Sequence, residues 1–257
     1  MSRWFCWTML ILVLAVLPSL TLSLAAANNN TLSDKETSEG WELAFDGETF
    51  DGWQGMKGTS FPSQSWTIRD GMICTQNDRS GGDIVSTEKY DDFMFELEWK
   101  ISPQGNSGIK YLVQQEWLNP GFQPDYDDDR KRRQWRAAVG FEFQILDDSR
   151  LEEGREEKTS TGALYLLYAP KNKQINPPGE WNHTRITVLG NRVEHWLNGG
   201  KLLEYELNSS ELMERVEETK FHKVPGYGIK AAGHLSLQHH GAPACFRNLK
   251  IRRIPGR

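Results

Sequence analysis

The chain of 257 residues lacks several patterns that identify common protein classes. It contains only three cysteines and no CxxC or HExxH sequence, so nothing in it argues for a zinc site. It carries no glycine-rich dinucleotide fingerprint, which excludes an oxidoreductase of the Rossmann type. Its net charge is −5 and its basic residues are scattered, so we expect no nucleic acid partner.

Long apolar runs are also scarce, and the clearest one lies near the N-terminus. Arg3 precedes the run Met9–Leu17, and the small residues Ala25–Ala27 follow it. This order predicts a secretory signal peptide over residues 1–27. An uncleaved anchor is the alternative, but the run is shorter than the ~20 residues of a membrane span. We therefore expect a secreted or periplasmic protein with no membrane contact after cleavage.

The remaining chain divides into a short lead-in and one domain. Residues 28–40 are polar and rich in turn formers, which predicts a flexible lead-in. Residues 41–257 have a length that suits a single all-β domain. Cys74 and Cys245 belong to this domain and could pair in an oxidising compartment. Their spacing does not require a bond, and we favour two buried small apolar side chains.

Helical periodicity is nearly absent from the domain, and short alternating segments separated by turn residues replace it. Many short strands of this kind predict a β-sandwich or a β-barrel. Asp70-Gly71 and Asn198-Gly199-Gly200 predict hairpin turns, and Glu211–Lys220 predicts one helix capped by Ser209 or Ser210. The predicted strands are Ser65–Ile68, Met72–Thr75, Asp83–Ser86, Phe93–Ile101, Ser107–Val113, Gly140–Leu146, Gly162–Tyr168, Trp181–Leu189, Arg192–Leu197, Lys201–Leu207, Gly233–Gln238 and Phe246–Ile251.

Two charged segments interrupt this pattern and predict exposed loops. They are Asp125–Arg136 and Glu152–Lys158. The first could instead form a lid over a cleft, because long loops in compact domains are often functional.

The segment Gly140–Asp148 (GFEFQILDD) carries the strongest signal for a site. Side chains alternate between the faces of a strand, so Glu142 and Gln144 share one face opposite a row of apolar residues. A β-bulge would bring Asp147 to the same face, although Asp147 could simply begin a turn. The spacing matches the E-x-D-x-x-E triad of laminarinase-type glucanases, except that an amide replaces the middle acid. That difference argues against ordinary retaining hydrolysis.

A second polar row is predicted near the C-terminus. Gln238 and His240 share a strand face, and the imidazole of His240 can act as a base, a hydrogen-bond donor or a metal ligand. Arg247 follows in the next strand and could pair with Asp147 or Glu142, either in a site or in a structural salt bridge.

The segment Asn106-Ser107-Gly108 predicts a turn into a strand. Its residue types are fully explained by the turn. In a functional interpretation, Asn106 and Lys110 hold sugar hydroxyls or stabilise an oxyanion.

The chain resembles the 3-keto-disaccharide hydrolase family, long labelled a domain of unknown function. The resemblance covers almost the whole domain. Its motifs are LAFDGETFDGW, WTIRDGMI, GGDIVSTEKYDDFMFELEWK, GNSGIKY, GFEFQILDD, TGALY, PPGEWN, WLNG and LQHHGAPACFRNLKI. The resemblance implies a concanavalin A-like sandwich of two antiparallel sheets. It also implies a small carbohydrate substrate, a glycoside already oxidised to a ketone at C3.

The chemistry implied by the resemblance is elimination followed by hydration. A base removes the acidified C2 proton, the aglycone leaves C1, and water adds to the unsaturated product. We expect Glu142 and His240 to be base and acid, in either order. Gln144, Gln238 and Lys110 would hold the enolate or nearby hydroxyls, and Asn106 and Arg247 would orient the sugar. A divalent metal could serve as a cofactor, with Glu142 and His240 among its ligands. A lectin-like module without catalysis is the alternative, because fold does not fix function.

Overall fold

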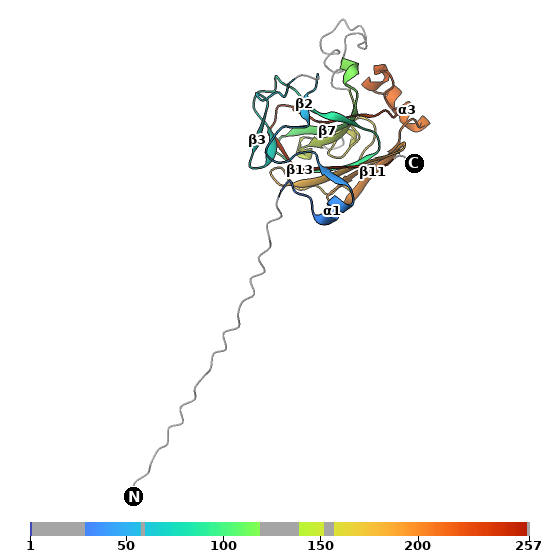
Figure 1. Cartoon of the computed structure of the whole chain (residues 1–257). Helices are drawn as coiled ribbons and strands as arrows, with labels where there is room; N and C mark the ends of the chain where they lie inside the picture. Colours follow the sequence, from blue (N-terminus) through green and yellow to red (C-terminus); the bar gives the residue numbers. More distant parts are fainter. Residues whose placement is uncertain (2–28, 58–59, 119–138, 152–156, 256–257) are drawn as a thin grey trace.

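The computed structural model describes residue 1 and residues 29–57, 60–118, 139–151 and 157–255. These residues form two antiparallel β-sheets that face each other, so the predicted concanavalin A-like β-sandwich is confirmed (Figure 1). The larger sheet has eight strands in the order β11-β10-β9-β6-β13-β4-β3, with β1 also paired to β13, and the smaller has five in the order β2-β5-β12-β7-β8. The strands are β1 Trp41–Leu43, β2 Trp53–Gly55, β3 Trp66–Arg69, β4 Met72–Thr75, β5 Ile84–Tyr90, β6 Phe93–Ile101, β7 Asn106–Val113, β8 Phe141–Leu146, β9 Asn182–Leu189, β10 Arg192–Leu197, β11 Gly200–Glu206, β12 Gly233–Leu237 and β13 Ala244–Arg253.

The larger sheet follows the usual pattern of one apolar and one wet face. Along β6, every second residue from Phe93 to Ile101 is buried in the core, and the residues between them are partly exposed. Both predicted hairpins are present, because Asp70-Gly71 joins β3 to β4 and Asn198-Gly199 joins β10 to β11. These residues adopt positive φ angles, as tight two-residue turns require.

The smaller sheet differs because its central strands are buried on both faces. All residues of β8 and β12 are buried, as are those of β7 after Asn106. One face packs on the core through apolar residues such as Ile109, Phe143 and Leu237. The outer face carries polar side chains, yet it is covered. This covered polar face contains the candidate site.

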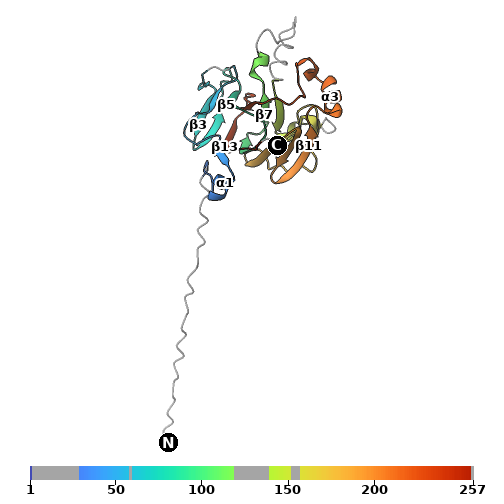
Figure 2. The same cartoon turned by 45° about the vertical axis from the view of Figure 1, so that its right-hand side comes forward.

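Helices are few and short among the described residues. The predicted helix is confirmed as α3 Ser210–Glu217, capped by Ser209, with Leu212 and Val216 buried. It ends before Lys220, which begins a separate 3-10 turn. In both views α3 lies at the side of the sandwich opposite β3 (Figures 1 and 2). The others are α1 Asp34–Ser38, η1 Gln115–Leu118, η3 Asp148–Arg150, η4 Glu157–Thr159 and η5 Lys220–Lys223.

One predicted strand is wrong. The segment Gly162–Tyr168 forms turns, with isolated bridges from Leu164 to Phe143 and to Tyr168. Backbone bonds from Gly162 N to Gln144 O (2.8 Å) and from Tyr165 N to Glu142 O (3.1 Å) attach it to the edge strand β8.

The two domain cysteines correct the sequence-based expectation of unpaired thiols. Cys74 and Cys245 form a disulfide, with their Cα atoms 4.1 Å apart. Strands β4 and β13 are neighbours in the larger sheet, and their register places these two residues directly opposite each other. Sequence spacing alone could not reveal this register, because the two residues are 171 positions apart.

The lead-in is also better anchored than predicted, from residue 29 onward. Asn30 is buried, and its side chain donates to Gly71 O (2.8 Å) and accepts from Asn248 N (2.9 Å). Helix α1 begins with a capping box of Ser33 and Glu36, and Glu36 accepts from Lys250 on β13 (2.6 Å). These bonds hold the lead-in against the larger sheet.

Several predictions fall on other parts of the chain. The signal peptide, the loop or lid at Asp125–Arg136 and most of Glu152–Lys158 lie outside the described residues. Within the described ranges, no helix has the length and apolar character needed to cross a membrane.

Candidate functional site

Glu142 lies on the covered outer face of the smaller sheet, on the edge strand β8. It projects from β8 opposite Lys110 on β7, and only 8% of its surface is exposed. One carboxylate oxygen accepts a hydrogen bond from Gln238 Nε2 (3.3 Å). Gln238 follows directly after β12, and its backbone N–H donates to Gly108 O (2.9 Å). Glu142, Lys110 and Gln238 therefore converge from three neighbouring strands, as the sequence predicts.

Gly108 creates the space that this carboxylate occupies. A Cβ atom at this position would lie 2.6 Å from Glu142 Oε1, closer than real contacts allow. Gly108 faces Gln144 across the β7–β8 pair, and Gln144 is buried with its Oε1 accepting from Ile145 N (3.1 Å). Gly108, the second glycine of the GNSGIKY motif, thus leaves room for the Glu142 carboxylate to lie over the sheet toward Gln238.

Lys110 is the most deeply buried charged group of the site, with 1% of its surface exposed. Its Nζ donates to Asp83 Oδ2 at 2.8 Å. Asp83 directly precedes β5, and β12 lies between β5 and β7. The ion pair therefore spans β12, where the small residue Ser236 faces Lys110. The other oxygen of Asp83 accepts from His239 N (2.9 Å), which ties the pair to the segment after β12.

A second lysine approaches Glu142 from outside the sheets. Lys220 begins η5 and is half-buried, with its Nζ 5.0 Å from the ring centre of Tyr165. Tyr165 donates its backbone N–H to Glu142 O, so the lysine stands beside the carboxylate's own strand. Lys220 and Glu142 interact electrostatically.

Burial and neighbouring charges shift the pKa values of these three groups in different directions. Burial raises the pKa of Glu142, and the Lys110 ammonium only partly opposes this. Burial alone would lower the pKa of Lys110, but the carboxylates of Asp83 and Glu142 outweigh it and raise that pKa. Burial lowers the pKa of Lys220. The site therefore combines a carboxylate with raised basicity, a fixed positive charge and a lysine that releases its proton more readily.

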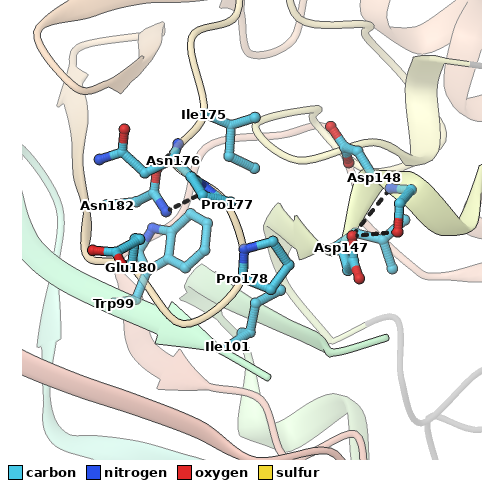
Figure 3. Close-up of a pocket in the computed structure, with 12 residues that line it drawn as sticks. Trp99, Ile101, Asp147, Asp148, Ile175, Asn176, Pro177, Pro178, Glu180 and Asn182 are labelled. Atoms are coloured by element: carbon cyan, nitrogen blue, oxygen red, sulfur yellow. Dashed lines mark hydrogen bonds between the residues drawn. The ribbon is translucent and has the colours of Figure 1, made fainter. Parts of the chain in front are cut away.

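Asn106 and Asp147 lie at the other end of the same strands. Asn106 pairs with Leu146, four residues beyond Glu142, which is about 13 Å along a strand. Asp147 caps the turn that follows, because its carboxylate accepts from Gln104 N (2.7 Å) and from Ser149 N and Oγ. It borders a separate pocket of about 270 Å³ beside Trp99, Pro177 and Pro178 (Figure 3).

Arg247 lies apart from the cluster, and His240 follows Gln238 by two residues with its side chain exposed. Arg247 is on β13 of the larger sheet, where it donates to Glu98 Oε2 (2.6 Å) and lies over the Trp181 ring (4.0 Å). It thus forms the structural salt bridge considered above, but with a different partner. His240 is exposed, because β12 ends at Leu237 and the alternation used to place it stops there. The buried neighbour His239 instead packs edge-on against Trp66.

Sequence reasoning missed Asp83, Lys220 and Tyr165. Asp83 lies within the GGDIVSTEKY motif and could have been weighed as a partner for a buried lysine. It also borders a cavity of about 510 Å³ that includes Lys57, Phe61 and Gln64. Lys220 carried no signal, since it belongs to a charged segment that reads as the end of a surface helix.

Among the described residues, no group of three or more His, Cys, Asp or Glu side chains is placed to hold a metal ion.

The fold and the site together define a β-sandwich protein with an acid–base cluster on its smaller sheet. A family model described as the 3-keto-alpha-glucoside-1,2-lyase-like domain matches residues 40–252. A protein of Bacteroides thetaiotaomicron named 3-keto-disaccharide hydrolase is 31% identical, over 91% of this chain and 85% of its own length. A crystal structure from Parabacteroides distasonis, provisionally named a glycosyl hydrolase, is 35% identical with a TM-score of 0.75 and covers 89% of this chain and 100% of its own.

The chain belongs to the 3-keto-alpha-glucoside-1,2-lyase-like family, as its motifs predict. This membership also confirms the predicted class of enzyme, one that cleaves a glycosidic bond.

Proposed function

We propose that this enzyme cleaves glycosides whose glucosyl unit carries a ketone at C3, by elimination and hydration. The observation that carries the proposal is Glu142, a buried carboxylate with raised pKa beside a fixed ammonium group on a covered polar face. The names of the family and of the relative support this substrate class. Elimination needs one well-placed base and charge stabilisation, which this cluster offers.

Glu142 is the base in this proposal. Its carboxylate removes the C2 proton, which the neighbouring ketone acidifies. Gln238 holds the carboxylate in place by donating to Oε1. Lys110, fixed by Asp83, supplies a positive charge that stabilises the negative charge as it moves to the enolate. A raised pKa matches the base to the weakly acidic proton that it must accept.

A classical retaining mechanism fits the cluster less well. That mechanism needs two carboxyl groups about 5 Å apart on either side of the scissile bond. Here Gln144 replaces the middle acid, Asp147 caps a turn, and Asp83 is engaged by Lys110. Of the two carboxylates that interact with Lys110, Asp83 forms the ion pair, and Glu142 accepts its side-chain hydrogen bond from Gln238.

We also propose that the protein works outside the cytoplasm. The Cys74–Cys245 disulfide supports this, because such bonds persist in oxidising compartments. The N-terminal sequence pattern supports it independently.

The test of the mechanism is Glu142→Gln, which keeps the shape of the side chain but removes the base. We expect kcat/KM on a 3-keto-glucoside to fall by about 10²–10⁴-fold, with substrate binding retained in calorimetry. Glu98→Gln is the matched control, because Glu98 lies on the larger sheet with Arg247, and its turnover should be unchanged. Near-normal turnover by Glu142→Gln would refute the assignment. Binding of unoxidised glycans without turnover by the wild type would favour the lectin-like alternative.

A further inference from the structure

Lys220 is an unusual lysine for a surface 3-10 helix. It is half-buried, and its ammonium lies 5.0 Å from the ring centre of Tyr165 and 5.4 Å from that of Phe221. Within the described part of the chain it forms no ion pair, whereas Lys110, Lys173, Lys230 and Lys250 each bind a carboxylate. Enclosing a charge without a paired carboxylate costs folding free energy, so the position of Lys220 calls for a functional explanation.

The position of Lys220 points toward the base. Tyr165, beneath the ammonium, donates its backbone N–H to Glu142 O, so the lysine and the carboxylate share one edge of the site. Glu142 and Lys110 are the charged groups that interact with it, the first attractively and the second repulsively. Burial lowers the pKa of Lys220, which makes its ammonium a better proton donor than an exposed lysine.

We propose that Lys220 is the general acid that protonates the departing glycosidic oxygen. This inference rests on the proposed function and assigns to Lys220 the acid role that sequence analysis divided between Glu142 and His240. The aromatic rings hold the ammonium by cation–π contacts, which position a charge without taking its proton. A carboxylate partner would instead hold the proton more tightly.

The two residues then complete a balanced cycle. In the elimination, the Glu142 carboxylate takes the C2 proton, the C1–O bond breaks, and Lys220 gives a proton to the leaving oxygen. In the hydration, the neutral Lys220 amine takes a proton from water as the hydroxide adds to C1, and Glu142 returns its proton to C2. The net change is addition of one water across the glycosidic bond, and both side chains regain their starting protonation.

The experiment compares two leaving groups in wild type, Lys220→Met and Lys220→Arg. One substrate is a 3-keto-disaccharide, whose sugar leaving group needs protonation. The other is 4-nitrophenyl 3-keto-glucoside, whose leaving group departs as an anion. We expect both variants to lose about 10²-fold or more in kcat/KM on the disaccharide and much less on the nitrophenyl substrate. Lys223→Met, at an exposed lysine of the same 3-10 helix, should show no such difference.

The Arg variant keeps the positive charge and most of the side-chain volume, which guards against misfolding. It cannot act as the acid, because arginine does not release its proton at neutral pH. Equal losses on the two substrates would overturn the acid role and would mean that Lys220 acts through charge stabilisation or packing. Unchanged activity in both variants would overturn any role. If the wild type cleaves neither 3-keto substrate, the proposed function itself fails, and this inference fails with it.

Discussion

Burial of the Glu142 carboxylate costs folding stability, as expected of the base that we propose. Its folded-state pKa lies above the unfolded value, so the folded chain favours the protonated form. The ionised carboxylate therefore destabilises the fold above the folded-state pKa. Below the unfolded value of about 4.3, both states are protonated and the cost disappears.

We accordingly expect Glu142→Gln to be more stable than wild type by about 1 kcal/mol at neutral pH, despite its loss of activity. Urea unfolding at neutral pH and at about pH 4 measures this, and the difference should shrink at the lower pH. A variant less stable than wild type at neutral pH would show that the carboxylate is structural.

Gly108 offers a second test at the scale of one residue. In Gly108→Ala, the new Cβ would lie 2.6 Å from Glu142 Oε1 and push the carboxylate off its position. A displacement of this kind can cost about 10²-fold in kcat/KM, with a small effect on stability because a side-chain end can move. Gly200→Ala is the control, since its Cβ would meet nothing closer than Leu197 O at 3.5 Å. Equal activity of the two variants would contradict the role given to Gly108.

Strand alternation predicted part of this cluster correctly, and its failures have physical reasons. Glu142, Gln144 and Lys110 lie inside regular strands, where the two-residue period holds. His240 lies three residues beyond the end of the strand at Leu237, so alternation cannot assign its side chain to a face. Arg247 pairs with Glu98 on the larger sheet and not with Asp147 or Glu142, since alternation gives the face of a residue but not the sheet to which its strand belongs.

At the scale of elements, the disulfide joins two strands that are far apart in the sequence. Cys74 on β4 and Cys245 on β13 close a loop that spans most of the domain. Reduction, or Cys245→Ser, should therefore lower the free energy of unfolding by about 2–4 kcal/mol. Denaturant unfolding with and without reductant measures the loss, and the Cys74→Ser/Cys245→Ser double variant should not respond to reductant. Identical stability of the wild type in both conditions would contradict a formed bond.

The long-range contacts of the site could not be predicted from the sequence, whereas most of the secondary structure could. The hairpins, most strands and α3 follow from turn residues and local patterns, which need only neighbouring positions. The Asp83–Lys110 pair spans β12, and Lys220 interacts electrostatically with Glu142 from a turn after α3. Such contacts depend on strand order and on how connecting segments fold over the smaller sheet, which no local pattern encodes.

The whole molecule is a sandwich that uses its two sheets differently. The larger sheet leaves its polar face partly exposed and supports the core, and the same face holds the anchored lead-in through Glu36 and Lys250. The smaller sheet buries a polar face. Burying polar groups costs free energy unless they are hydrogen-bonded, so such a face indicates either a bonded network or a functional site. The fold thereby holds Glu142, Lys110 and Lys220 near one another on the smaller sheet, where we propose that they act as base, fixed charge and acid.

We propose that this chain acts on a sugar already oxidised at C3. The most direct measurement is a product assay on a matched pair, trehalose and its 3-keto derivative, with and without added divalent metal. We expect release of glucose and 3-keto-glucose from the oxidised member alone. Cleavage of unoxidised trehalose at a comparable rate would contradict it, because elimination cannot begin without the ketone.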